Sequence, residues 1–252
     1  MSNRFTERKQ LQKRILHQRI AFAVLFIGFI SLVVLGIVGL VKLIQKPSVE
    51  ETMVASDDDM QMLIDLKEMM EQKELTIILD AGHGGNDVGT GDESYWEKDI
   101  NMDIVLKMKD MLSYCGVNVL LTRDGDETLA LDERSAFANE HEEADYFVSV
   151  HCNYCEDDAS VSGLECYYWE GSEQGKNYAQ SIIDTVALED RIVVRGIKTD
   201  NFHVLRETKM PAILIETGYL SNVEEKKNLY DDTYQKTVAL FLVKGIISGA
   251  LD

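Results

Sequence analysis

Two histidines stand directly after short apolar runs that the sequence predicts to be strands. His83 follows LTIILD (75–80) within the glycine-rich stretch DAGHGGNDVG, and His151 follows DYFVSV (145–150). Because the carboxyl ends of parallel strands meet at one edge of a sheet, we expect the two imidazoles to lie close together. The glycines leave the ring of His83 open to a metal ion or a substrate. A single histidine of this kind is more often an ordinary hydrogen-bonding residue, whereas a pair makes a shared metal ion a serious hypothesis.

Two glutamates occupy comparable positions. Glu97, in YWEKD, stands where a helix is expected to begin, and an acid there is also favoured simply by the helix dipole. Glu216 ends the apolar run AILIE (212–216), where an unpaired buried charge is costly, so a role in a site is the better interpretation. Two histidines and one glutamate suit a zinc site with an open position. The second glutamate then remains as a general base for attack on a carbonyl.

Other motifs near these residues are incomplete. The glycine-rich stretch lacks the last glycine of GxGxxG, since Asp87 stands there, and GxxxxGK[ST] is absent. HEEAD (141–145) resembles the zinc-binding HExxH but has Asp145 in place of the second histidine. The pair Cys152 and Cys155 forms a lone CxxC, which is weak evidence for a redox or zinc site. The histidine–glutamate pattern is therefore the main chemical signal.

Strand-like runs alternate with helical patterns over the rest of the chain. This alternation predicts an α/β fold: a single domain with a mostly parallel twisted sheet flanked by helices on both faces. The further expected strands are 117–122, 164–169, 202–205 and 212–216, and the expected helices are 97–114, 131–142, about 174–188, 222–230 and 232–249.

The N-terminal part predicts one transmembrane helix before this domain. The uncharged run 20–41 would span about 33 Å as a helix, enough for a hydrocarbon core of about 30 Å. Six basic residues precede the run, so the positive-inside rule places the N-terminus in the cytoplasm and the domain outside, facing the wall. We expect a single-pass cell-membrane protein with these parts: a basic cytoplasmic tail (1–19), a transmembrane anchor (20–44), an acidic stalk or linker (45–74) and a catalytic domain (75–252). A solvated stalk is the favoured interpretation of 45–74, with a short amphipathic helix as the alternative.

The charge of the exported part excludes one class of partner. Residues 47–252 contain 17 basic and 43 acidic residues. A domain of this sign repels phosphate backbones, so we expect no nucleic-acid binding. The chain is 45% hydrophobic, which excludes disorder over most of its length.

Four separated motifs resemble those of a known family. DAGHGGNDVGT, the following EKD, SVHCN and VLRETKMPAILIETGYLSN are similar to motifs of the zinc-dependent N-acetylmuramoyl-L-alanine amidases of the Amidase_3 family, over roughly residues 75–250. The resemblance implies that His83, Glu97 and His151 bind one Zn²⁺ and that Glu216 is catalytic. It also implies a substrate, the amide bond between N-acetylmuramic acid and L-alanine in peptidoglycan. The expected role is cell-wall remodelling in division, sporulation or germination, as in short membrane-anchored members.

Three further residues are candidates for supporting the site or contacting substrate. We expect Asp80 to orient His83 and place Asn153 beside the site. Arg206 suits a bidentate contact with a substrate carboxylate, with an ordinary salt bridge as the alternative. The path from His151 to Arg195 is filled by an expected strand and helix, so we predict no inserted helix covering the metal.

The expected partners are peptidoglycan and, through the N-terminal helix, the membrane; protein partners are not indicated by the sequence. Two alternative functions remain open: a catalytically silent peptidoglycan-binding module, and a zinc peptidase that cuts within the stem peptide.

Overall fold

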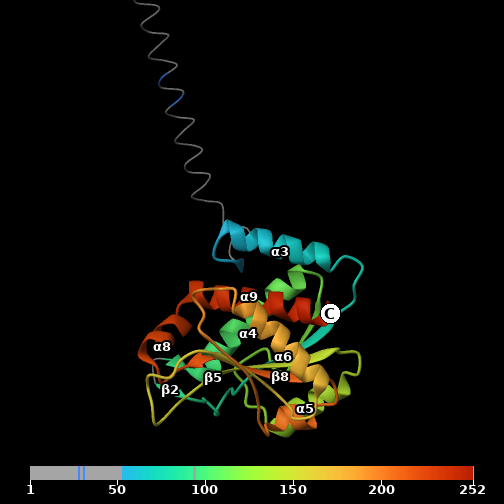
Figure 1. Cartoon of the computed structure of the whole chain (residues 1–252), viewed down its shortest axis with the longest axis vertical. Coiled ribbons are helices and arrows are strands. Elements are labelled where there is room, and N and C mark those ends of the chain that lie inside the picture. The colour runs from blue at the N-terminus through green and yellow to red at the C-terminus, as the bar shows by residue number, and fades with distance from the viewer. Residues whose placement is uncertain (1–27, 29–30, 32–52, 93–94, 252) are drawn as a thin grey trace, which may run out of the picture. The chain divides into compact units, whose positions relative to one another are not determined.

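A computed structural model describes residues 28, 31, 53–92 and 95–251 (Figure 1). The chain divides into two units, 1–48 and 49–252, and the second contains every element described below. In the labels of Figure 1 these elements are α3 (Asp57–Met69), β1 (Thr76–Ala81), β2 (Gly91–Asp92), β3 (Tyr95–Trp96), α4 (Glu97–Tyr114), β4 (Asn118–Leu121), α5 (Leu131–Glu140), β5 (Tyr146–Asn153), β6 (Leu164–Tyr168), α6 (Glu173–Val186), β7 (Val194–Thr199), α7 (His203–Glu207), β8 (Ala212–Tyr219), α8 (Val223–Leu229) and α9 (Asp232–Leu251).

Six strands form the main sheet in the order β4-β1-β5-β8-β6-β7. The first four are parallel to one another, β6 is antiparallel to β8, and β7 is parallel to β6. The predicted α/β class, with a mostly parallel sheet between helices, is therefore confirmed. The sequence reasoning missed β7 because this edge strand reads VRGIKT, whose charges and glycine hide any apolar alternation.

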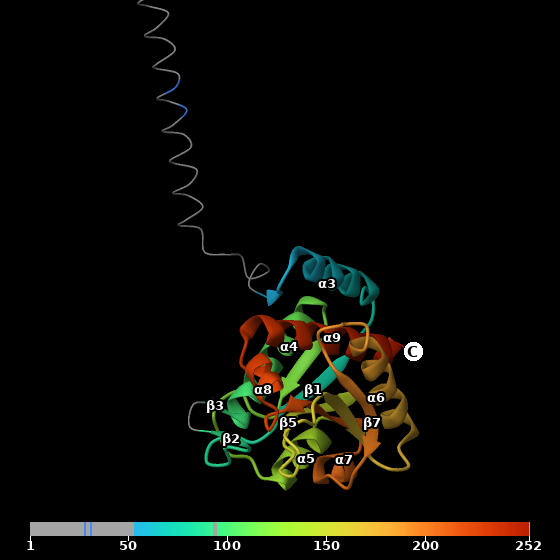
Figure 2. The ribbon, with the colours of Figure 1, turned by 60° about the vertical axis from the view of Figure 1, so that its left-hand side comes forward.

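The two faces of the sheet are covered differently (Figures 1 and 2). Helices α4, α6 and α9 lie on one face, and the short helices α5 and α7 lie on the other. Alternate residues of β1 show the division, since Ile77 and Leu79 join the larger core while Ile78 joins the smaller one. Side chains alternate between faces along a strand, so Asp80 belongs to the thinly covered face with Ile78.

The expected strand at 202–205 is wrong, because these residues begin α7 instead. Val204 and Leu205 are both buried against the smaller core, although they are neighbours in sequence. A strand would direct them to opposite faces, whereas a helix on the sheet surface can bury both. An apolar run of four residues is too short to distinguish the two cases.

The solvated stalk predicted for 45–74 is also wrong over its second half. Helix α3 packs on the domain, with Leu63, Leu66 and Met70 buried in the larger core. The hydroxyl of Ser56 accepts a hydrogen bond from the backbone N–H of Asp59 at 3.2 Å and caps the helix. The acidic run that suggested a solvated segment lies in the first turn, where the helix dipole favours it. The amphipathic alternative is the one the structure contains.

The expected anchor at 20–44 lies outside the described residues, apart from Gly28 and Ser31. Among the residues that are described, no helix has the length and apolar character needed to cross a membrane.

Candidate active site

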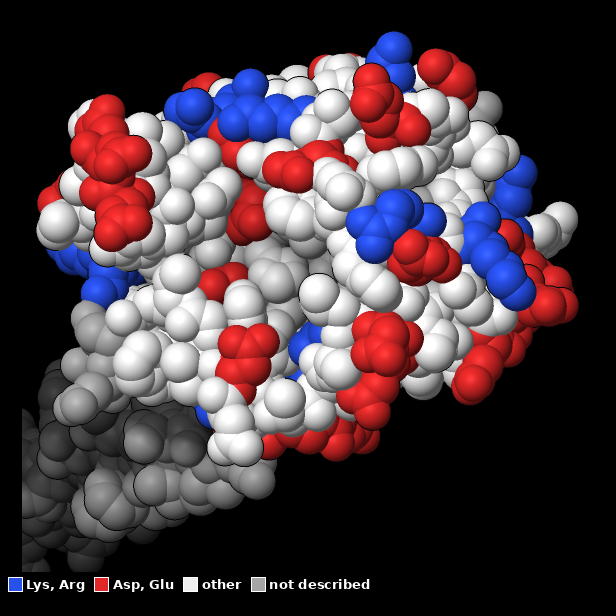
Figure 3. Space-filling view, turned by 90° about the horizontal axis from the view of Figure 1, so that it is seen from below, with Lys and Arg blue, Asp and Glu red and all other residues white. Residues whose placement is uncertain are grey.

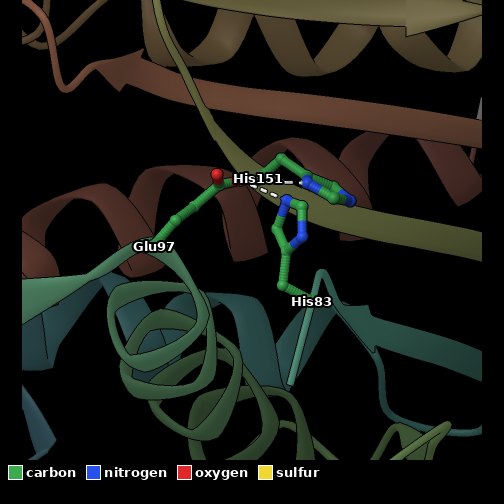
Figure 4. Close-up of side chains that lie close together, drawn as sticks. All are labelled: His83, Glu97 and His151. Carbon is green, nitrogen blue, oxygen red and sulfur yellow. Dashed lines mark hydrogen bonds and ion pairs between the residues drawn. The ribbon is translucent and has the colours of Figure 1, made fainter. Parts of the chain in front are cut away.

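His83, Glu97 and His151 converge at the carboxyl ends of β1 and β5 (Figure 4). The Nε2 atom of His83 and the Nδ1 atom of His151 each lie 3.1 Å from Oε1 of Glu97. The two imidazole rings meet edge to face with their centroids 5.0 Å apart. One nitrogen or oxygen from each side chain falls within 4.8 Å of the others, an arrangement able to hold a metal ion. The structure thus brings together the three ligands expected from the sequence.

The glycines around His83 are needed for this close approach. A Cβ atom on Gly82 would come within 2.2 Å of the His151 ring. At Gly89 (φ +67°) it would come within 2.6 Å of Glu97 Oε2 and 2.8 Å of His83 Cδ2. His83 itself has φ of +60°, a strained conformation for a residue with a side chain. The glycine-rich stretch therefore lets His151 and Glu97 pack against its backbone, a role beyond the open approach to His83 that the sequence indicated.

Glu97 is the most firmly held of the three candidate ligands. Its Oε2 accepts hydrogen bonds from the backbone N–H of Thr90 at 2.9 Å and from its hydroxyl at 3.1 Å, and its Oε1 accepts one from the backbone N–H of Cys152 at 3.2 Å. Burial opposes ionisation, but hydrogen bonds from His151 and His83 outweigh it and hold the pKa of Glu97 well below its usual range. The carboxylate is therefore ionised, as a metal ligand must be.

Electrostatics at His83 reflect its acidic surroundings. Its Nδ1 lies 2.9 Å from Oδ2 of Asp87, a contact that the sequence reasoning did not anticipate. Burial lowers the pKa of His83, but Glu97 and Asp87 together raise it to about 9. A metal ion bound here would displace that proton.

Glu216 lies beside His151, its direct partner in the β5–β8 register. Its Oε2 is buried and has no hydrogen-bond partner among the described residues. Burial raises the pKa of Glu216 to about 7, since little around the carboxylate compensates for lost water. It also lines a cavity of about 470 Å³, together with His83, His151, Leu131, Phe202 and Val204.

Among the described residues, Asp80 does not contact the ring of His83, so it does not orient this histidine directly as expected. The Asp80 carboxylate accepts hydrogen bonds from Thr122 Oγ1 at 2.6 Å, Arg134 Nη1 at 2.6 Å and Ser149 Oγ at 2.7 Å, and none from the histidine ring. Despite complete burial, the charge of Arg134 keeps the pKa of Asp80 below its ordinary value. Any influence of Asp80 on His83 passes through Arg134, which also donates to the His83 carbonyl at 2.7 Å.

Two buried arginines support the loop that carries His83. Arg123 donates to the carbonyls of Ala81 at 2.8 Å and Gly82 at 3.1 Å, and Arg134 donates to Ala81 at 2.8 Å. Arg123 and Arg134 lie 42 and 53 positions after Ala81, the last residue of β1. Only the fold brings them to this loop, so sequence reasoning did not identify them.

The remaining candidates lie less centrally. The amide of Asn153 donates to Glu165 Oε2 at 3.4 Å, so Asn153 supports an acidic neighbour. Arg206 lies on α7 and pairs with Glu207 at 2.7 Å and with Asn201, which is the ordinary salt-bridge alternative. It does not line the cavity.

The segment between His151 and Arg195 contains β6 and α6, and α6 packs against α9 on the larger core. Within the described residues, this segment contributes no helix over the metal ligands, as predicted.

The fold and the site define an α/β protein with a candidate hydrolytic metal centre at one edge of its sheet. Residues 77–248 match the family model described as N-acetylmuramoyl-L-alanine amidase (Amidase_3). This match covers more than half of the chain, and the chain belongs to that family.

Relatives and solved structures agree with this assignment. The chain is 36% identical over 176 residues to the uncharacterized protein YqiI of Bacillus subtilis, covering 69% of this chain and 84% of that protein. It is 36% identical over 170 residues to the N-acetylmuramoyl-L-alanine amidase CwlM of Bacillus licheniformis, covering 65% and 64%. The catalytic domain of the amidase CwlV from Bacillus (Paenibacillus) polymyxa var. colistinus superimposes with a TM-score of 0.64 and 37% identity, covering 69% and 97%.

Proposed function

We propose that this protein is a zinc-dependent amidase that hydrolyses the bond between N-acetylmuramic acid and L-alanine in peptidoglycan. Membership of the amidase family gives the reaction. The observation that carries the metal dependence is the convergence of His83, Glu97 and His151 within 4.8 Å, with Glu216 beside them.

The residues present fit zinc. Two imidazole nitrogens and one carboxylate oxygen form the donor set of hydrolytic zinc sites, which keep a further position open. When bound, zinc would polarise the scissile carbonyl and lower the pKa of a bound water. The buried Oε2 of Glu216, without a partner among the described residues, is suited to a water or a substrate amine at this point.

Glu216 would move the proton. As its pKa lies near 7, the carboxylate can accept a proton from water at Oε2 as the water oxygen bonds to the lactyl carbonyl carbon. The same proton then passes to the nitrogen of L-alanine as the carbon–nitrogen bond breaks. The products are a free muramic acid carboxyl group and a stem peptide with a new N-terminal amine.

The test is identification of the product by mass spectrometry after digestion of purified peptidoglycan. We expect the free amine of L-alanine to appear, to vanish with chelator and to return with added Zn²⁺. A new amine within the stem peptide would instead establish the peptidase alternative. Binding without cleavage by the metal-loaded protein would establish a silent binding module.

We further propose that 20–44 anchors the enzyme as a single-pass membrane protein with the catalytic domain facing the wall. The apolar run and the six basic residues before it support this topology. Protease added to intact, wall-stripped cells should degrade the chain beyond about residue 47. Protection of the domain in those cells, with degradation after lysis, would reverse the orientation.

A further inference from the structure

A buried carboxylate beyond Glu216 holds two cations that the proposed mechanism does not use. Glu165 on β6 is completely buried, and its Oε1 accepts from Arg195 Nε at 2.5 Å and Lys198 Nζ at 2.6 Å. Its Oε2 accepts a hydrogen bond from the Tyr167 hydroxyl at 2.7 Å. Two cations thus share one carboxylate in a domain that is otherwise strongly acidic, and the charge of Arg195 also acts on the buried Glu225.

The strand register places this cluster in line with the catalytic residues. Glu165 is the direct antiparallel partner of Glu216, which in turn pairs with His151. Directly opposite residues project from the same face of a sheet, and neighbouring strands lie about 4.8 Å apart. The Glu165 carboxylate thus lies about 10 Å from the metal ligand His151, across the position of Glu216.

The cations are open to solvent although the carboxylate beneath them is not. The side chains of Arg195 and Lys198 are 39% and 43% exposed, against 0% for Glu165. Their positions are restrained by aromatic rings, with Arg195 5.7 Å from the centre of Tyr219 and Lys198 5.9 Å from that of Tyr167. The face seen in Figure 3 carries many acidic side chains, and basic ones gather in a few separate groups.

Arg195 and Lys198 have more N–H donors than their hydrogen bonds to Glu165 use. Arg195 uses Nε for Glu165, and its Nη1 makes a long 3.4 Å contact with the Ser162 carbonyl. A guanidinium has five N–H donors and an ammonium has three, so donors remain for a second anion.

We propose that Arg195 and Lys198, held in place by Glu165, bind the free α-carboxylate of the stem-peptide residue that follows L-alanine. This inference rests on the proposed amidase function. An extended chain spans up to about 3.5 Å per residue, so that carboxylate lies about 7 Å from the scissile carbonyl. The pair is centred on Glu165, about two strand spacings or about 10 Å from His151. The arginine and lysine side chains are long enough to cover the difference between this distance and about 7 Å. Neither side chain lines the cavity of about 470 Å³, as is also true of Arg206, but the register places this pair two strands from His151, so the pair takes the role that the sequence suggested for Arg206.

The experiment compares two soluble substrates in the full-length protein. Both contain N-acetylmuramoyl-L-alanine, followed by D-isoglutamate in one and D-isoglutamine in the other, so that they differ only in carboxylate against carboxamide. We expect kcat/KM of the wild type to be about 10- to 100-fold higher for the carboxylate. In Arg195→Gln/Lys198→Gln the ratio should fall towards one, mainly through a higher KM for the carboxylate substrate, and the ratio is the readout because loss of both cations from Glu165 can slow both substrates.

Matched variants separate this role from a structural one. Lys198→Gln alone removes one exposed cation and should lower the ratio partway. Arg191→Gln removes another exposed cation, paired with Glu189 at 2.6 Å, and should leave the ratio unchanged. Raising the salt concentration should reduce the wild-type ratio, since exposed charges are screened.

A wild-type ratio near one, or an unchanged ratio in both folded Lys198→Gln and the double variant, would overturn the assignment. Absence of L-alanine release from either substrate by the zinc-loaded wild type would instead refute the proposed function, so the two failures are distinguishable.

Discussion

The two faces of the central sheet perform different tasks with the same strands. The face under α4, α6 and α9 is mostly apolar, and residues such as Leu79, Val148 and Ile215 are completely buried there. The opposite face is apolar only under α5 and α7, and towards the strand ends it carries His151 and Glu216. Stability is therefore concentrated on the thickly covered face, while chemistry occupies the thinly covered one.

The comparison of the two faces explains why polar residues are tolerated in buried strands. On the thin face each buried ionisable group is either paired, like Asp80 with Arg134 at 2.6 Å and Glu165 with Arg195, or is left for function, like Glu216. A buried polar atom without a partner costs free energy, and active sites are where such a cost is retained.

The largest expected effect on activity comes from removing a candidate metal ligand from the thinly covered face of the sheet. His83→Ala, Glu97→Ala and His151→Ala should each lose bound zinc and nearly all amidase activity, because each supplies one of three donors. Elemental analysis and L-alanine release check both effects. His141→Ala is the control, since this histidine pairs with Glu143 at 2.9 Å away from the cluster. Stoichiometric zinc in His83→Ala would show that the ligand assignment is wrong.

Glu216→Gln should keep zinc but slow turnover by about two to four decades, the range expected for loss of a general base. Measurement of kcat on zinc-replete protein tests this, with Glu224→Gln, an exposed carboxylate on α8, as the control. Near-normal turnover with a full complement of zinc would exclude the role.

A change on the thickly covered face should lower the stability of the protein while leaving its zinc content and activity intact. Leu79→Ala should lower the free energy of unfolding by about 2–5 kcal/mol because it leaves a cavity in a packed core. Zinc content and activity at 25 °C should persist. Denaturant unfolding measures the loss, and Leu188→Ala, at a side chain that is 68% exposed, should change little. Loss of zinc from folded Leu79→Ala would contradict the view that one face provides stability and the other provides the metal site.

The smallest effect is the pH dependence contributed by Glu216. Burial raises its folded-state pKa to about 7, so the folded state retains a proton that the unfolded chain releases above about 4.5. Stability of the metal-free protein should therefore fall as pH rises from about 4.5 to 7. Glu216→Gln should remove this fall and be more stable than the wild type above pH 7, by on the order of 3 kcal/mol. Parallel pH profiles for the two proteins would contradict the assigned burial cost.

Several features of the fold and site could be predicted from local sequence. The runs 75–80 and 145–150 predicted β1 and β5, and the polar residues after them predicted where the ligands meet. This succeeded because parallel strands bring their carboxyl ends together whatever the remaining sequence is. The glycines around His83 likewise indicated an open approach to this histidine, but only the structure shows that His151 packs on Gly82 and Glu97 on Gly89.

Local sequence was less informative where the environment decides the structure. The segment 202–205 forms a helix because the sheet surface beneath it buries adjacent residues, and α3 packs because the core offers an apolar surface for Leu63 and Leu66. Short segments with weak patterns take the conformation that tertiary contacts favour.

The sequence by itself indicated the α/β class through its alternating strand-like and helical runs, and the candidate metal-binding residues His83, Glu97 and His151 through residue type, position at element ends and resemblance to the amidase motifs. Only the tertiary structure decided how these groups are supported and charged. Arg134 reaches the His83 loop across 51 positions of sequence, and Glu165 meets Arg195 across 30. Such pairings depend on strand order and register, which long-range packing fixes and no local pattern contains.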